Sequence, residues 1–101
     1  MAEESDVALA VMRIAALQAN GITTFYKAKK DIPNLIALSA TNLSQSIPRH
    51  PEPMWHQLIR NIKSHDKSDG NYIQLGYLEH VPRVGYKITP KGQAFLKKNG
   101  Y

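Results

Sequence analysis

The sequence predicts a mainly α-helical domain with a small β-hairpin, an α+β fold. Three stretches before residue 66 place apolar residues at the spacing of one helix face. Two strand-like runs, 78–81 and 86–89, flank the loop 82–85, which contains a proline and a glycine and so favours a hairpin. A chain of 101 residues has the length of one domain, so we expect a single unit over 1–101, with 1–4 disordered.

The first helix is expected over Val7 to Ala19. Ser5 or Asp6 can cap it, and the acids nearby suit the positive end of a helix dipole. Its apolar side chains form one wide face: Val7, Leu9, Val11, Met12, Ile14, Ala15, Ala16 and Leu17. A face this wide predicts a central helix that packs on two sides. Asn20-Gly21 ends the helix, because this pair tolerates positive φ.

A second helix is expected over Phe25 to Asp31, after a short extended link at Ile22-Thr23. Thr24 can cap this helix, and Pro33 ends it because the residue before a proline is pushed out of the α region. The apolar run in 34–39 fits either one helical turn or a buried extended piece. A further short turn follows from Thr41.

A third helix is expected over 53–65, after a stiff extended connector from Pro48 to Pro53. Pro53 would occupy the first helical position, where its missing N–H costs nothing. One face of this helix is apolar and belongs in the core: Trp55, Leu58, Ile59 and Ile62. The rest of its surface is polar and contains no acid: His56, Gln57, Arg60, Asn61, Lys63, Ser64 and His65. A surface helix usually mixes both charge signs, so this composition favours an anionic partner.

The remaining elements are a turn over 66–71, the hairpin and a last helix. Thr89 can cap this last helix and Pro90 suits its first position. Ala94, Phe95 and Leu96 are expected to face inward.

Three helices followed by a two-stranded hairpin is the plan of the winged helix-turn-helix fold. In that fold the third helix enters the major groove, and the hairpin, or wing, lies beside the backbone or minor groove. The charge is unevenly distributed: 1–20 hold three acids and one base, whereas 21–101 hold twelve bases and five acids. A basic domain of this size suggests a polyanionic partner. We therefore expect double-stranded DNA as the partner, with the wing at about 79–88.

The candidate DNA-contacting residues fall into two groups. Arg binds guanine through two hydrogen bonds, and Asn and Gln bind adenine in the same way. The candidates for base edges are Gln57, Arg60, Asn61 and Ser64, with His56 on the same polar face. Lys neutralises phosphate, and a basic wing tip reaches the backbone. The candidates for phosphate or the minor groove are Arg49, Lys63, Lys67, Arg83 and Lys87.

Several motifs carry a family resemblance: Trp55, Arg60-Asn61, Ser64-His65, Asn71, Gly76-Tyr77-Leu78 and Gly85-Tyr86-Lys87-Ile88-Thr89-Pro90-Lys91-Gly92. With these the chain resembles winged-helix domains of bacterial restriction-system proteins, such as the N-terminal domain of Mrr-type endonucleases. The resemblance covers 54–98 well and 5–50 only through element order. It implies a DNA-targeting module of a restriction-type or regulatory system, tethered to or acting beside a nuclease or methyltransferase. Whether the chain is a fragment, a stand-alone protein or a transcription regulator stays open.

No residue pattern favours catalysis, a cofactor or a metal. The chain has no cysteine, and no two of its four histidines have the spacing of a zinc site. Ser64, His65 and Asp66 are neighbours in sequence, and neighbours on a helix point in different directions. We therefore expect a protein that is not an enzyme and holds neither metal nor cofactor.

The longest apolar run, Val7 to Met12, is far too short for a membrane span, and the acidic N-terminus is unlike a secretory signal. We expect a cytoplasmic protein near the nucleoid, without a membrane partner. The alternative function is a winged helix used as a protein-interaction module. Its docking surface would then be an exposed apolar patch at Leu35 to Leu38.

Overall fold

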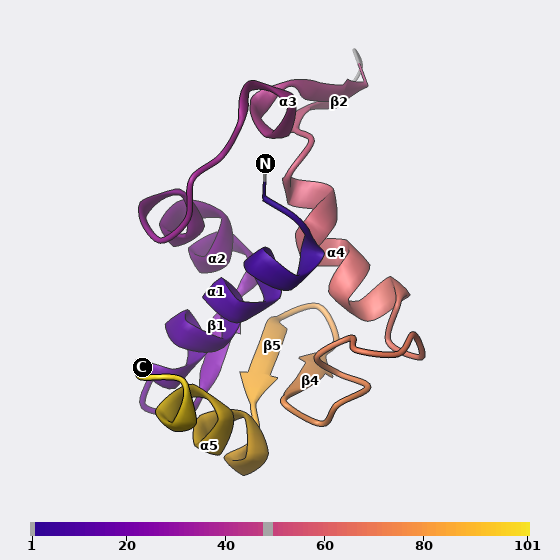
Figure 1. The fold of residues 1–101 in the computed structure, drawn as a ribbon. Helices are drawn as coiled ribbons and strands as arrows, with labels where there is room; N and C mark the ends of the chain where they lie inside the picture. The colour runs from indigo at the N-terminus through magenta and orange to yellow at the C-terminus, as the bar shows by residue number, and fades with distance from the viewer. Residues whose placement is uncertain (1, 48–49) are drawn as a thin grey trace.

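Figure 1 shows a computed structural model, which describes residues 2–47 and 50–101. The fold is α+β, with helices around a small antiparallel sheet. Its elements, in chain order, are α1 (Glu4–Ala16), β1 (Ile22–Thr24), α2 (Phe25–Asp31), the 3-10 turn η1 (Ile32–Asn34), α3 (Ala40–Leu43), β2 (Gln45–Ile47), β3 (His50–Pro53), α4 (His56–Ser64), β4 (Leu78–Val81), β5 (Gly85–Ile88) and α5 (Pro90–Lys98).

The main sheet has three strands in the order β1-β5-β4, all antiparallel. The predicted hairpin is confirmed as β4 and β5, with Leu78 opposite Ile88. The segment expected as a mere link, Ile22-Thr23, is instead part of β1, and Thr24 lies opposite Gly85. A three-residue strand has too short a pattern to be recognised alone, and its pairing with β5 supplies the missing hydrogen bonds.

Helix α1 lies across the middle of the molecule and contacts α2, α4, α5 and the sheet (Figure 1). Its central role was predicted, and its buried side chains are Val7, Ala8, Ala10, Val11, Met12, Ile14 and Ala15. The helix ends at Ala16, three residues before the expected end, and Leu17 is 84% exposed. The prediction that Ala16 and Leu17 widen the apolar face is therefore wrong, because the chain already leaves the helix there to reach β1.

The N-terminus also differs from the expectation that 1–4 are disordered, since the structure gives residues 2–4 a defined place. Helix α1 begins at Glu4, and the Asp6 carboxylate accepts a hydrogen bond from the Glu3 N–H at 2.8 Å. Ala2 is buried, and its N–H donates to the Asn42 side-chain oxygen at 3.0 Å. In return the Asn42 amide donates to the Ala2 carbonyl at 3.2 Å. The side chain of Asn42, on α3, thus fixes the position of the N-terminal residues through these two hydrogen bonds.

The connector before α4 forms a second hairpin, β2 with β3, at one end of the molecule (Figure 1). Pro53 is the last residue of β3 and opposes Gln45, whereas α4 begins at His56. The expectation that Pro53 opens the helix is therefore wrong. The prolines of this segment favour an extended backbone, and the segment pairs as strand β3 with β2 instead.

Helix α5 begins as predicted, with the Thr89 hydroxyl accepting a hydrogen bond from the Gly92 N–H at 2.9 Å. A β-carbon at Gly92 would lie 2.3 Å from the Tyr77 carbonyl oxygen, so only glycine lets α5 pack this closely on the chain before β4. Leu96 is buried and Phe95 half-buried, but Ala94 is exposed, contrary to expectation. None of the helices in the described ranges is both long and apolar enough to span a bilayer.

Candidate nucleic-acid interface

Helix α4 buries the apolar stripe that its spacing predicts. Trp55 is 2% exposed, and Ile59 and Ile62 are fully buried against α1 and the sheet. Leu58 is half-buried at the edge of the same face. Trp55 is thus a core residue. The rest of the helix faces outward.

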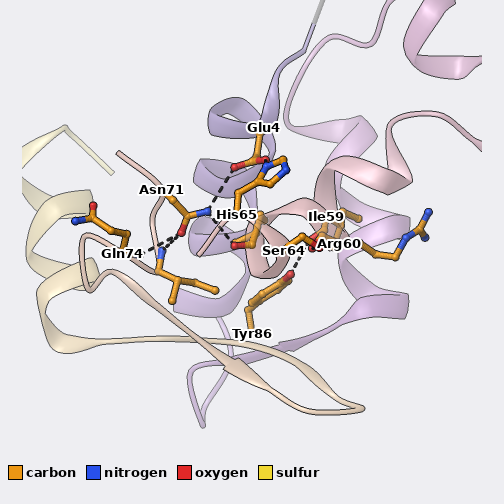
Figure 2. A network of polar contacts seen from close by, with 10 residues as sticks. Glu4, Ile59, Arg60, Ser64, His65, Asn71, Gln74 and Tyr86 are labelled. Atoms are coloured by element: carbon orange, nitrogen blue, oxygen red, sulfur yellow. Dashed lines mark hydrogen bonds and ion pairs between the residues drawn. The ribbon is translucent and has the colours of Figure 1, made fainter. Parts of the chain in front are cut away.

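Two side chains hold the backbone of α4 against the rest of the fold (Figure 2). The Tyr86 hydroxyl on β5 donates to the Ile59 carbonyl at 2.5 Å. The Asn71 amide donates to the Ile62 carbonyl at 2.9 Å, and its oxygen accepts from the backbone N–H groups of Ile73 and Gln74. These bonds fix both the position and the rotation of α4, which a helix that reads DNA needs.

The burial of Tyr86 predicts a pH dependence of stability. Burial raises the pKa of Tyr86 to about 12, from an ordinary value of 10.0. The folded state favours the neutral phenol, so its contribution is complete below pH 10 and is lost as the pH rises through 12. Urea unfolding should show the wild type losing roughly 2–3 kcal/mol over this range. Tyr86→Phe should lack that loss while costing about 1 kcal/mol at neutral pH. Parallel pH profiles for the two proteins would contradict the assignment.

The outermost part of α4 carries Arg60 and Ser64, both exposed, with Lys67 exposed in the turn that follows. The Ser64 hydroxyl donates to the Arg60 carbonyl at 3.3 Å, which leaves its oxygen able to accept. His56 is half-buried at the start of the helix and packs edge-on against Trp55. The guanidinium of Arg60 points outward, away from α1 and the sheet (Figure 2).

Lys63 is also exposed, but its ammonium pairs with the Asp66 carboxylate at 2.5 Å. The hydrogen bond from Lys63 lowers the pKa of Asp66, so the acid stays ionised beside the base. Part of the positive charge that Lys63 would offer to a phosphate is therefore neutralised within the domain. Sequence reasoning missed this pair because it treated 66–71 as a turn only.

Gln57 and Asn61 lie on a different flank of α4 from Arg60. Both are half-buried and line a hollow of about 310 Å³. The other lining residues come from the N-terminus, α3, the turn before α4 and α4 itself: Ala2, Glu3, Glu4, Thr41, Asn42, Met54 and Leu58. Two of the four predicted base-edge residues therefore face acidic neighbours that the polar pattern of α4 does not reveal.

The hairpin tip is held against the end of β1 and the start of α2. Thr24 opposes Gly85, the first residue of β5, and the Phe25 N–H donates to the Val84 carbonyl at 3.0 Å. The tip is therefore level with the start of α2. Arg83 is exposed there, with a left-handed φ of +65°.

Lys87 is exposed on β5 and faces away from α4. Adjacent residues of a strand point to opposite faces, and its neighbour Tyr86 reaches α4. Lys87 thus lies on the opposite face of the sheet from α4, and its contact with phosphate from the wing stays a prediction. Arg49 lies outside the described residues.

Glu4 was not anticipated as part of this region. Its carboxylate contacts the His65 ring nitrogen at 2.6 Å and the Asn71 amide at 3.4 Å (Figure 2). These contacts join residues 61 and 67 positions apart. The only sequence signal is the cluster of acids before Val7, which also fits a simple helix-dipole role.

No protein-family model, curated protein or solved structure matches this chain. Within residues 2–47 and 50–101, no group of three or more His, Asp or Glu side chains is placed to hold a metal ion.

Proposed function

We propose that the chain is a winged helix-turn-helix domain that binds double-stranded DNA without catalysis, with α4 in the major groove. The observation that carries this proposal is α4 itself. Its apolar face is buried, its backbone is anchored at Ile59 and Ile62, and its outward side chains include no acid. A rigid helix with a basic, hydrogen-bonding outer face is what base and phosphate recognition requires.

The arrangement of elements supports the winged-helix part of the proposal. Helices α1, α2 and α4 precede the β4–β5 hairpin, and β1 pairs with β5 at the side of the sheet. Two features depart from the usual plan. The connection 32–55 between α2 and α4 is much longer than the three- or four-residue turn of a simple helix-turn-helix. The strands of the hairpin also end level with β1, so only the turn 82–84 extends past it. Both departures make α4 the principal contact and the hairpin a minor one.

Roles follow from position and chemistry. Arg60 is the main base-edge candidate, because it is exposed at the centre of the outer face and can make paired bonds to guanine. Ser64 accompanies it one turn later. Lys67 supplies charge to a phosphate, and Lys63 does so to a smaller extent because Asp66 competes for it.

The experiment that tests DNA binding is a salt titration on a selected site and on random duplex. A domain of this size should meet about four to six phosphates, which gives a log–log slope of affinity against salt near −4 to −5. Arg60→Ala should cost about 1–3 kcal/mol on the selected site and less on random duplex. Lys67→Ala should weaken binding equally on both and reduce the slope by about one unit. Absence of any binding by the wild type at low salt would end the proposal.

Arg83→Gln tests the hairpin tip. The change keeps the β-carbon at the left-handed position and removes only the charge, so folding should be unaffected. We expect a uniform loss of roughly two- to fourfold in affinity on every duplex, because the tip meets only the sugar–phosphate backbone. Fluorescence anisotropy with labelled duplexes measures this. Unchanged affinity on random duplex would show that the tip does not touch DNA.

The alternative, a protein-interaction module, is less well supported at the patch expected for it. Leu35, Ile36 and Leu38 are half-buried and pack against the core, so only Ala37 of the expected patch is fully exposed. Leu35 also lines a hollow beside the exposed Leu17. A nuclease or methyltransferase as tethered or separate partner remains a proposal that follows from the resemblance of 54–98.

A further inference from the structure

We propose that the acidic start of α1 determines which side of α4 can face the DNA backbone. This inference rests on the proposed DNA binding. Glu3 and Glu4 border the hollow lined by Gln57 and Asn61, so acids stand next to one flank of the helix. The opposite flank carries Lys63, and Arg60 lies between the two. The outer face of α4 is thus polarised across its width.

The position of these acids is built into the fold. Glu4 is held by its contacts with His65 and Asn71, and Asn71 is itself bonded to the Ile62 carbonyl of α4 (Figure 2). Ahead of it, the backbone of Ala2 is clamped by Asn42. The acids therefore stay beside α4 rather than moving freely with a loose terminus.

The consequence for binding is electrostatic. A phosphate that approached the Gln57–Asn61 flank would meet two carboxylates within about one Debye length. A phosphate at the opposite flank would meet Lys63, whose positive charge Asp66 neutralises only in part. Uncharged base edges carry no such penalty. The carboxylates therefore repel the phosphates of the DNA backbone from this flank but do not repel base edges. Gln57 and Asn61 can then contact only bases. This restricts the domain to one orientation in the groove.

Glu3→Gln is the decisive variant. The Glu3 side chain is exposed but takes part in the capping box of α1, where its oxygen accepts from the Asp6 N–H while the Asp6 carboxylate accepts from the Glu3 N–H. Gln keeps an acceptor oxygen at this position, so the change removes the charge and preserves the bond. We expect affinity for random duplex to rise about threefold at low salt, with the gain fading as salt screens the repulsion. The double variant Glu3→Gln with Glu4→Gln should raise the affinity for random duplex about tenfold. Its melting temperature is measured as well, because the Glu4 carboxylate also contacts His65 and Asn71.

Asp31→Asn is the matched control. It changes the net charge by the same amount, and because it also breaks an ion pair with Lys27 at 3.0 Å, its melting temperature is measured as well. Asp31 ends α2, which lies on the other side of α1 from α4 (Figure 1). The proposal requires a clearly smaller gain for Asp31→Asn than for Glu3→Gln. Equal gains, or none for Glu3→Gln, would overturn it while leaving DNA binding intact. No binding by the wild type would instead overturn both this inference and the proposed function.

Discussion

Trp55→Ala should lower the free energy of unfolding by about 3–5 kcal/mol, as truncation of large buried aromatics does. Trp55 is 2% exposed, packs edge-on against His56, and its backbone N–H donates to the Asn42 carbonyl at 3.0 Å. It therefore joins the start of α4 to α3 and to the core. Its removal leaves a cavity at the point where α4 begins, so the helix should lose order from this end.

Urea or thermal unfolding followed by far-ultraviolet circular dichroism measures the loss, since this variant has no tryptophan to report by fluorescence. Leu58→Ala is the matched comparison, because Leu58 belongs to the same face but is only half-buried and should cost less. Any loss of the proposed DNA binding in Trp55→Ala should follow the fraction of the variant that is folded. A melting temperature equal to that of the wild type, together with lost binding, would make Trp55 a DNA contact rather than a core residue.

Local patterns in the sequence predicted local structure well. The bounds of α2, the capping roles of Thr24 and Thr89, and the buried stripe of α4 all depend on residues within a few positions of one another. Spacing and cap chemistry are sufficient for such features. The polar outer face of α4 was predicted for the same reason.

Features that depend on distant segments were not predicted. Strand β1 exists through its pairing with β5, and Ala2 is ordered by Asn42, which lies 40 positions away. The acids beside Gln57 belong to the first turn of α1, so the sequence of α4 alone could not indicate them. The same limit applies to the direction in which Lys87 points, which follows from the bond between its neighbour Tyr86 and Ile59 of α4.

Gly85→Ala should destabilise the domain by roughly 3 kcal/mol or more, because its β-carbon would overlap backbone rather than a flexible side chain. The added carbon would lie 1.9 Å from the Thr23 carbonyl oxygen and 2.9 Å from the Thr24 α-carbon. Neither atom can move without separating β1 from β5. The substitution would therefore break the pairing that holds the hairpin tip level with α2.

Gly70→Ala is the matched control for Gly85→Ala. A β-carbon at Gly70 meets nothing within 4 Å, but its φ of +85° disfavours any other residue, so the cost should be only about 1 kcal/mol. Chemical unfolding of both variants separates steric overlap from backbone preference. If β1 is displaced, the hydrogen bond from the Tyr86 hydroxyl to the Ile59 carbonyl is weakened. The proposed DNA affinity should then fall in Gly85→Ala even where the protein remains folded. Equal destabilisation by the two changes would show that the close β1–β5 approach contributes nothing beyond glycine's backbone freedom.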